Sequence, residues 1–289
     1  MPEPLPPNTF TAHTPAWNAY NSCVDLEALA SWGAFVQDLD PRIGNPSLEA
    51  FMFQNPPEVA GRTLGYALRF APNDTGRNCV AREVNACNGD IESLAGLAHL
   101  YIYGLIRVFR NPKGPTPTIT ADQSPDVTFD QQANIHKISL ITPGAQPTSL
   151  RKKLLYRDQY RCVLTGLIDR ASLDKAEETP ELFPDLASLV APQAPAVPGE
   201  LLSDLEVAHI ISQSLTDGIG GLSEAATAKL DWASSASAIL DRFSGIDIKL
   251  LLGGTNLHSA INGFMASLEA HALFDRLDFC LIQARVHSF

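Results

Sequence analysis

Three polar residues in the C-terminal half of the chain have types and spacings that could perform hydrolytic chemistry. His209 lies between two short apolar arms in LEVAHIISQSL, residues 205–215, where it is either a general base or a histidine buried at the end of a strand. His271 and Asp275 stand four positions apart in LEAHALFD. On a helix both of these side chains lie on one face and can reach one cation. An imidazole together with a carboxylate suits Mg, Mn or a later transition ion.

The surrounding residues predict the elements that must position these side chains. LEVAHII, residues 205–211, is typical of a short strand, and LEAHALFDRLDFCLI, residues 268–282, predicts a helix that turns into a strand. TSLRKKLLYRDQ, residues 148–159, has apolar positions at helical spacing, and YRCVLTGLI, residues 160–168, indicates a hairpin. We also expect a helix over residues 222–243, within the long insert before the last helix.

Four pieces of this half occur in a characteristic order. They are YRDQYRCVLTG, LEVAHII, INGFMASLEAH and FD, and all of them lie between Pro147 and the C-terminus, a region of about half the chain. In this order they resemble the HNH endonuclease family, in particular the branch common in fungi, which has a long insert between its first two signature residues. The resemblance implies an α+β fold with a ββα-metal core and a helical insert.

The resemblance also implies a role for each matching residue. His209 corresponds to the general base that activates water, Asn262 to the asparagine that holds the loop and orients this base, and His271 to a metal ligand on the helix. Asp275 is then the second protein ligand of one divalent metal, which stabilises the charge that develops on the scissile phosphate. The expected activity is the metal-dependent hydrolysis of phosphodiester bonds in nucleic acid, DNA rather than RNA.

One position departs from the family pattern. Many HNH enzymes carry Asp or His immediately before the base as a further metal ligand, and this chain has Ala208 there. Glu206 is near, but a residue three positions from His209 on an extended strand points to the opposite face. We therefore do not expect Glu206 to replace the missing ligand, and His271 and Asp275 stay the expected ligand pair.

A nucleic-acid partner requires local positive charge, because the whole chain has a formal net charge of -11. Residues 147–289 alone contain 12 Lys and Arg against 18 Asp and Glu. The cations cluster in RKKLLYRDQYR, which indicates either a helix and turn that bind a phosphate backbone or an ordinary solvated helix face. The candidate nucleic-acid-binding residues are Arg151, Lys152, Lys153, Arg157 and Arg161.

The N-terminal half carries no readable motif. The first 90 residues are rich in Pro, Asn and Gly and predict short mixed elements and loops. Residues 91–110 predict a largely buried helix, and residues 119–141 predict a loop and a strand. We therefore expect a mixed α/β N-terminal region over residues 1–146, packed on an HNH-like domain over residues 147–289.

Composition restricts the class of protein. A hydrophobic share of 45% with 18% charged residues suits a packed chain. No stretch approaches the roughly 20 apolar residues of a membrane span, and the N-terminus lacks a secretory pattern. The five scattered cysteines form no CxxC pair and favour isolated thiols in a reducing compartment. We expect a cytoplasmic or nuclear protein with no membrane partner.

Two further functional hypotheses stay open. A degenerate HNH scaffold could act as a small-molecule enzyme or as a binding protein, which Ala208 and the acidic balance both favour. A deep apolar pocket for a small-molecule ligand, without a basic groove at His209, would distinguish it. An interaction module without catalysis would instead use the insert around Trp232 as its docking surface.

Overall fold

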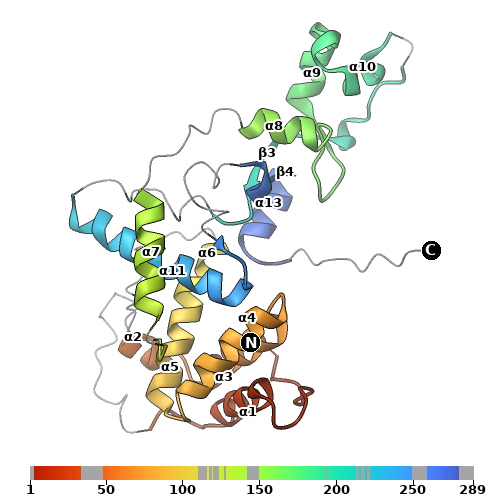
Figure 1. Ribbon diagram of the computed structural model, residues 1–289. Helices are drawn as coiled ribbons and strands as arrows, with labels where there is room; N and C mark the ends of the chain where they lie inside the picture. Colours follow the sequence, from red (N-terminus) through yellow and green to blue (C-terminus); the bar gives the residue numbers. More distant parts are fainter. Residues whose placement is uncertain are drawn as a thin grey trace. The chain divides into compact units, whose positions relative to one another are not determined.

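The computed structural model describes residues 3–33, 48–109, 116, 119, 124–126, 128–141, 150–192, 194–212, 215, 219, 222–248 and 259–279. The chain divides into two compact units (Figure 1). Unit 1 comprises Met1–Val108, Pro112–Pro143 and Ser214–Gly254, and unit 2 comprises Phe109–Asn111, Gly144–Gln213 and Thr255–Phe289. Helices dominate, and the four described strands all lie in unit 2, which confirms the α+β class.

The described part of unit 1 is helical. Its α-helices are α1 (Pro15–Glu27), α2 (Leu48–Gln54), α3 (Pro57–Phe70), α4 (Asp74–Ala86), α5 (Ile91–Leu100), α7 (Phe129–Ile141) and α11 (Glu224–Ser244). A π-helical segment, η2 (Tyr101–Ile106), directly continues α5 and leads into the short α6 (Arg107–Phe109). The predicted buried helix over residues 91–110 is therefore confirmed as far as Phe109, the last described residue of this segment, and its second half is π-helical.

The expectation of a mixed α/β N-terminal region is wrong for the described residues. Pro, Asn and Gly were interpreted as signs of loops, but Pro15 and Asn73 stand at the starts of helices. The Thr14 side chain accepts a hydrogen bond from Trp17 N–H ahead of Pro15, and Asn73 accepts one from Gly76 N–H at the start of α4. Such capping positions favour the same residue types as turns do.

The strand expected within residues 119–141 is also wrong, because α7 occupies residues 129–141. Three buried side chains of α7, those of Phe129, Ala133 and His136, follow one another at intervals of four and three residues. This spacing places them on one helix face, whereas a strand would require alternation.

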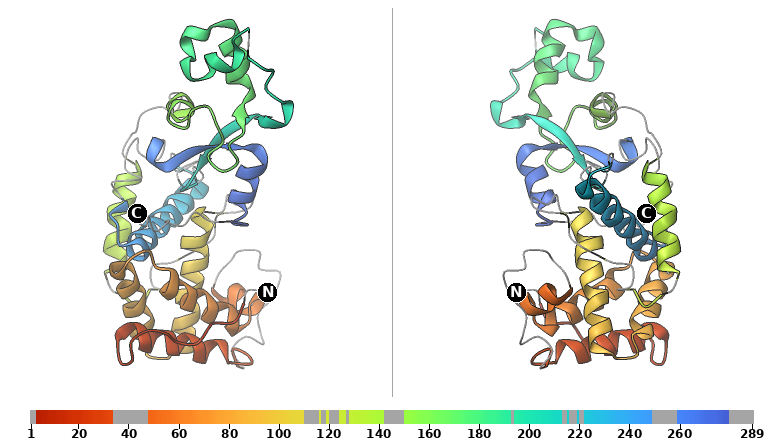
Figure 2. Two further views of the ribbon diagram at one scale, coloured as in Figure 1. Left: turned by 90° about the vertical axis from the view of Figure 1, so that its right-hand side faces the viewer. Right: turned by 90° about the vertical axis from the view of Figure 1, so that its left-hand side faces the viewer.

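The predicted helix over residues 222–243 is confirmed as α11, but it belongs to unit 1 and not to the C-terminal domain. It begins at Ser223, whose side chain accepts from Ala226 N–H, and ends at Gly245 with a positive φ of 63°. It packs against α7, α4 and η2, and lies beside α7 in each view of Figures 1 and 2. The buried Trp232 donates its Nε1–H to the carbonyl of Tyr103 at 2.8 Å, which anchors α11 in this core.

Unit 2 begins with α8 (Leu150–Arg157) and a turn that closes on β1 (Ile168–Asp169). The turn matches the predicted hairpin: Arg161 and Ile168 form an antiparallel bridge, and Cys162 N–H donates to the carbonyl of Leu167 at 2.8 Å. β1 then pairs in parallel with β2 (Leu202–Ser203). The residues between these two strands form α9 (Arg170–Glu178), η5 (Pro180–Leu182), α10 (Pro184–Val190) and η6 (Gly199–Leu201).

The centre of unit 2 is an antiparallel pair followed by a helix. β3 (Leu205–His209) pairs with β4 (Gly263–Ser267), the short η9 (Ala260–Asn262) precedes β4, and α13 (Leu268–Asp275) follows it. The strand at 205–209 and the helix from 268 are thus as predicted, and the strand expected after α13 falls mostly outside the described residues. The core beneath them is apolar and contains Leu154, Ala208, Phe264, Met265, Ala266, Ala270 and Phe274 among others.

Candidate functional site

His209 ends β3 directly opposite the first residue of β4, Gly263. Side chains of opposed residues in a strand pair share one face. A Cβ on Gly263 would lie 3.2 Å from Leu154 Cδ1 of α8, so the face that carries the half-buried His209 is the face toward α8. The opposite face carries Phe264, whose ring meets the ring of Phe274 on α13 edge-on at 5.2 Å.

Asn262 holds the backbone immediately beyond His209. Its side chain is only 5% exposed. Its Oδ1 accepts a hydrogen bond from Ile211 N–H at 2.8 Å, and its Nδ2 donates to the carbonyl of Ile211 at 3.0 Å. Its own carbonyl accepts from Ile210 N–H at 2.9 Å. The amide side chain thus continues the β3–β4 ladder past the last paired residue and fixes the direction in which the chain leaves His209.

His271 is held between two carboxylates. Its Nδ1 lies 2.5 Å from Oε1 of Glu206 on β3, and its Nε2 lies 3.5 Å from Oδ1 of Asp275, one helical turn later on α13. All three side chains are partly exposed, at 19% for His271, 46% for Glu206 and 27% for Asp275. The predicted pair of His271 and Asp275 therefore does share one helix face.

As expected, strand alternation separates Glu206 from His209. The contact of Glu206 with the candidate ligand His271 was not predicted. The neighbour that matters is His271 on α13, which lies on the face of β3 that Ala208 and Glu206 share. No bend of the strand is needed, because all five β3 residues stay in register with β4.

Arg157 and Asp158 hold the edge of β4 that faces away from β3, where Val163 N–H also donates to the carbonyl of Met265 at 2.9 Å. The Arg157 guanidinium pairs with Asp158 and donates to the backbone carbonyls of Ala260 and, at 2.9 Å, Gly263. The Asp158 carboxylate accepts from Met265 N–H at 2.8 Å. The end of α8 is thereby fixed to the beginning of β4, which lies opposite His209 and directly follows Asn262.

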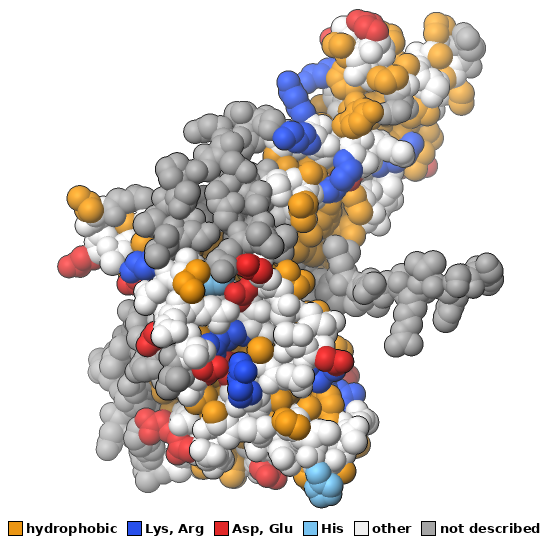
Figure 3. Space-filling view, viewed as in Figure 1, with side chains coloured by type: hydrophobic (Ala, Val, Ile, Leu, Met, Phe, Trp, Pro, Cys, Tyr) orange, Lys and Arg blue, Asp and Glu red, His pale blue; other side chains and the backbone are white. Residues whose placement is uncertain are grey.

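Two more of the predicted nucleic-acid-binding residues donate hydrogen bonds to other residues of unit 2. Arg151 donates to the Asp169 carboxylate at 3.3 Å and to the carbonyl of Leu205 at 3.1 Å, and Arg161 donates to the carbonyl of Gly166 at 3.1 Å. Lys152 and Lys153 are exposed on α8. Figure 3 shows basic side chains on the visible face around α8 as separate groups with apolar and uncharged surface between them.

Sequence reasoning missed Asp169, which organises the entry into β3. Its side chain is fully buried, accepts from Leu205 N–H at 3.2 Å, and accepts from both the N–H and the hydroxyl of Ser172 at 3.1 and 2.6 Å. The only sequence signal is its position before a helix, since Asp169 is the N-cap of α9. The bond to Leu205 depends on residues that are 36 positions apart and has no local pattern.

Cys162 is a buried thiol in the core of unit 2. Burial raises its pKa, but hydrogen bonds from Thr165, and contacts with the backbone of Ser267 and Leu164, outweigh that effect and hold the pKa below the ordinary value. Its Sγ accepts from Thr165 N–H at 3.4 Å. The described cysteines, Cys23, Cys79, Cys87 and Cys162, are all free thiols, as expected.

Within the described ranges, no group of three or more His, Cys, Asp or Glu side chains is arranged around one metal position. The strand alternation places His209 on the face of β3 toward α8 and His271 with Asp275 on the face toward α13, so the convergence of all three on one cation stays a prediction. Comparison with known proteins gives no match to a protein family, a curated protein or a solved structure. Of the helices in the described part of the chain, none is both long and apolar enough to cross a membrane.

Proposed function

We propose that unit 2 is an HNH-like, metal-dependent nuclease domain that hydrolyses phosphodiester bonds in DNA. The observation that carries the proposal is the arrangement of two antiparallel strands followed by a helix, with His209 at the end of the first strand, Asn262 before the second and His271 on the helix. These are the positions that the resemblance to HNH endonucleases assigns to a base, its orienting amide and a metal ligand.

The donor atoms present fit a divalent ion. Two ligand atoms at about 2.1 Å from one ion lie at most about 4.2 Å apart. The 3.5 Å between His271 Nε2 and Asp275 Oδ1 lies within this limit. An ion bound there would stabilise the charge that builds on the phosphate and on the leaving oxygen.

Glu206 acts in this proposal as a positioning residue and not as a ligand. At 2.5 Å from Nδ1, its carboxylate leaves no space for an ion on that side of His271. It instead accepts the Nδ1 proton, which leaves Nε2 as a neutral lone-pair donor directed toward Asp275. This interaction fixes both the tautomer and the ring orientation of His271. It does not supply the metal ligand that many HNH enzymes carry at the position of Ala208.

The other residues position the base and the substrate. His209 takes the proton of the attacking water, while Asn262 holds the backbone beyond it through two hydrogen bonds to Ile211. Lys152 and Lys153, which are exposed on α8, contact the phosphate backbone. The three arginines of the candidate set already donate hydrogen bonds to backbone carbonyls within unit 2.

The test compares metal binding and cleavage in the same set of full-length variants. Mn²⁺ binding is measured by calorimetry, and nicking of supercoiled plasmid and of single-stranded DNA is measured with Mg²⁺, Mn²⁺ or Ni²⁺. We expect His271→Ala to abolish both, and Glu206→Gln to weaken Mn²⁺ binding by about 10- to 100-fold. Glu269→Gln, on the exposed first turn of the same helix, removes an equal charge without touching His271 and serves as the matched control.

Two results would contradict the proposal. Wild-type protein that binds none of the three ions would exclude the metal site, and equal Mn²⁺ affinities in Glu206→Gln and Glu269→Gln would exclude the positioning role. Metal binding without cleavage of either DNA substrate would reject the nuclease assignment while leaving the metal site intact.

A further inference from the structure

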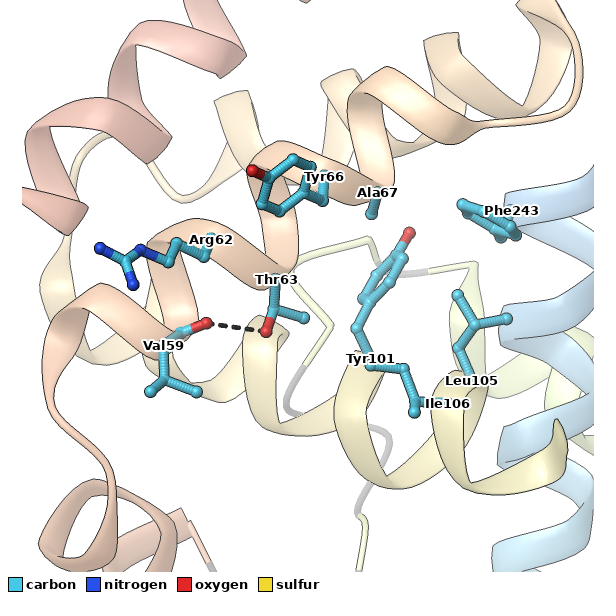
Figure 4. Close-up of a pocket in the computed structure, with 9 residues that line it drawn as sticks. All are labelled: Val59, Arg62, Thr63, Tyr66, Ala67, Tyr101, Leu105, Ile106 and Phe243. Carbon is cyan, nitrogen blue, oxygen red and sulfur yellow. Dashed lines mark hydrogen bonds between the residues drawn. The ribbon is translucent and has the colours of Figure 1, made fainter. Parts of the chain in front are cut away.

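Unit 1 contains a pocket that the nuclease proposal does not use. It has a volume of about 400 Å³, is open to solvent on one side, and is lined by three elements of unit 1: α3, the π-helical η2 and the end of α11. Figure 4 shows the rings of Tyr66, Tyr101 and Phe243 around it, each from a different element. The remaining lining residues are Val59, Arg62, Thr63, Ala67, Leu105 and Ile106.

The polar groups in this lining already have partners within the protein. The Thr63 hydroxyl donates to the carbonyl of Val59 at 2.7 Å, and the Tyr66 hydroxyl donates to the carbonyl of Pro4 at 3.0 Å. The Arg62 guanidinium points away from the rings and pairs with Glu27 at 2.6 Å. The lining that an occupant contacts is therefore almost entirely carbon surface and offers no free charge to pair with.

A buried polar network holds two of the three walls in place. The Tyr101 hydroxyl donates to Glu83 at 2.8 Å, and Glu83 pairs with Arg242 at 2.7 Å, both charged side chains being at most 5% exposed. Burial and the nearby Glu83 carboxylate raise the pKa of Tyr101, so its phenol keeps the proton that it donates. Arg242 directly precedes Phe243, and the network thus links η2, α4 and α11 and preforms the pocket.

The π-helical geometry of η2 is a second observation that points to a functional role for this pocket. Tyr101, Leu105 and Ile106 all come from η2, where the backbone bonds run from residue i to i+5 and the helix is wider. Such segments cost stability and occur often at functional sites.

We infer that unit 1 binds a small, uncharged, ring-containing molecule between Tyr66, Tyr101 and Phe243. The size follows from the volume: an apolar cavity of about 150 Å³ holds one benzene ring, so 400 Å³ accommodates two such rings with substituents. The apolar class follows from the lining, since a charged group would be desolvated there without compensation. Pockets of this size and character are typical of ligand sites.

The test uses Prodan, a neutral naphthalene dye that brightens in apolar surroundings, with the full-length protein. We expect saturable one-to-one binding that is weakened at least tenfold in Ile106→Trp, where the larger ring fills the pocket from its exposed rim. Ile135→Trp, the same substitution at an exposed position on α7, should bind Prodan as the wild type does. Equal melting temperatures of the two variants exclude a loss caused by unfolding.

A displacement experiment tests the chemical class. Methyl naphthoate should displace Prodan at a concentration at least tenfold lower than naphthoate, because the ester carries no charge. Absence of saturable Prodan binding, or equal affinities in Ile106→Trp and Ile135→Trp, would overturn the site. Stronger displacement by the carboxylate than by its ester would overturn the assignment to uncharged ligands.

Discussion

Replacement of Asn262 by alanine tests whether this side chain holds the backbone beyond His209. The substitution removes the acceptor of Ile211 N–H and the donor to the Ile211 carbonyl, and Ile211 itself is only 6% exposed. A buried backbone group left without a partner costs about 1–3 kcal/mol, and two such groups, with partial entry of water, cost about 2–4 kcal/mol. We expect this free-energy cost to destabilise the segment that follows β3.

Amide hydrogen exchange measures this effect locally, which avoids treating two units as one cooperative transition. At about 1.4 kcal/mol for each factor of ten, Ile211 N–H should exchange about 30- to 700-fold faster in Asn262→Ala than in the wild type. Ile261→Ala, at the neighbouring and 74% exposed position, is the control and should leave the exchange rate unchanged. An acceleration below about threefold in Asn262→Ala would refute the assigned role.

Three other predictions follow from the described contacts. Gly263→Ala should destabilise the β3–β4 pair by about 1–3 kcal/mol, because the new Cβ would lie 3.2 Å from both Ala208 O and Leu154 Cδ1; unchanged exchange of β4 amides would contradict this. Glu83→Leu should destabilise unit 1 by about 3–5 kcal/mol in denaturant titrations, because it leaves Arg242 with a single carboxylate partner; a loss below about 1 kcal/mol would show that Asp126 suffices. Burial raises the pKa of Asp241, but hydrogen bonds from His136, Ile248 N–H and Gln132 hold it below the ordinary value. The stability that Asp241 contributes is therefore complete above about pH 3.9 and is lost as the pH falls through the lower pKa of the folded state, a loss that Asp241→Asn should reduce in acid titrations.

The elements that carry the candidate site could be predicted because their signals are local. LEVAHII is a short, mostly apolar run typical of a strand, His271 and Asp275 have helical spacing, and the turn after α8 contains Thr-Gly. The partner of His271 could not be predicted in the same way. Its contact with Glu206 joins residues 65 positions apart and depends on how α13 crosses the strand pair.

The N-terminal helices were missed for a different physical reason. Proline, threonine and asparagine mark both turns and helix starts, and only the following three residues distinguish them. The position of α11 depended on tertiary packing: its apolar face suits either unit, and the Arg242–Glu83 pair joins residues 159 positions apart. The sequence pattern predicted the helix but not that it packs into the core of unit 1.

The measurement that tests the central claim most directly is plasmid nicking by wild type, His209→Asn and His13→Asn with Mn²⁺ at equal protein concentration. His13 is exposed and has a positive φ of 63°, a conformation that asparagine tolerates, so its variant controls for loss of a histidine. We predict metal-dependent nicking by wild type and His13→Asn, and a loss of at least 100-fold in His209→Asn, as expected for removal of a general base. Equal nicking by all three proteins, or none by folded wild type with bound metal, would contradict the account.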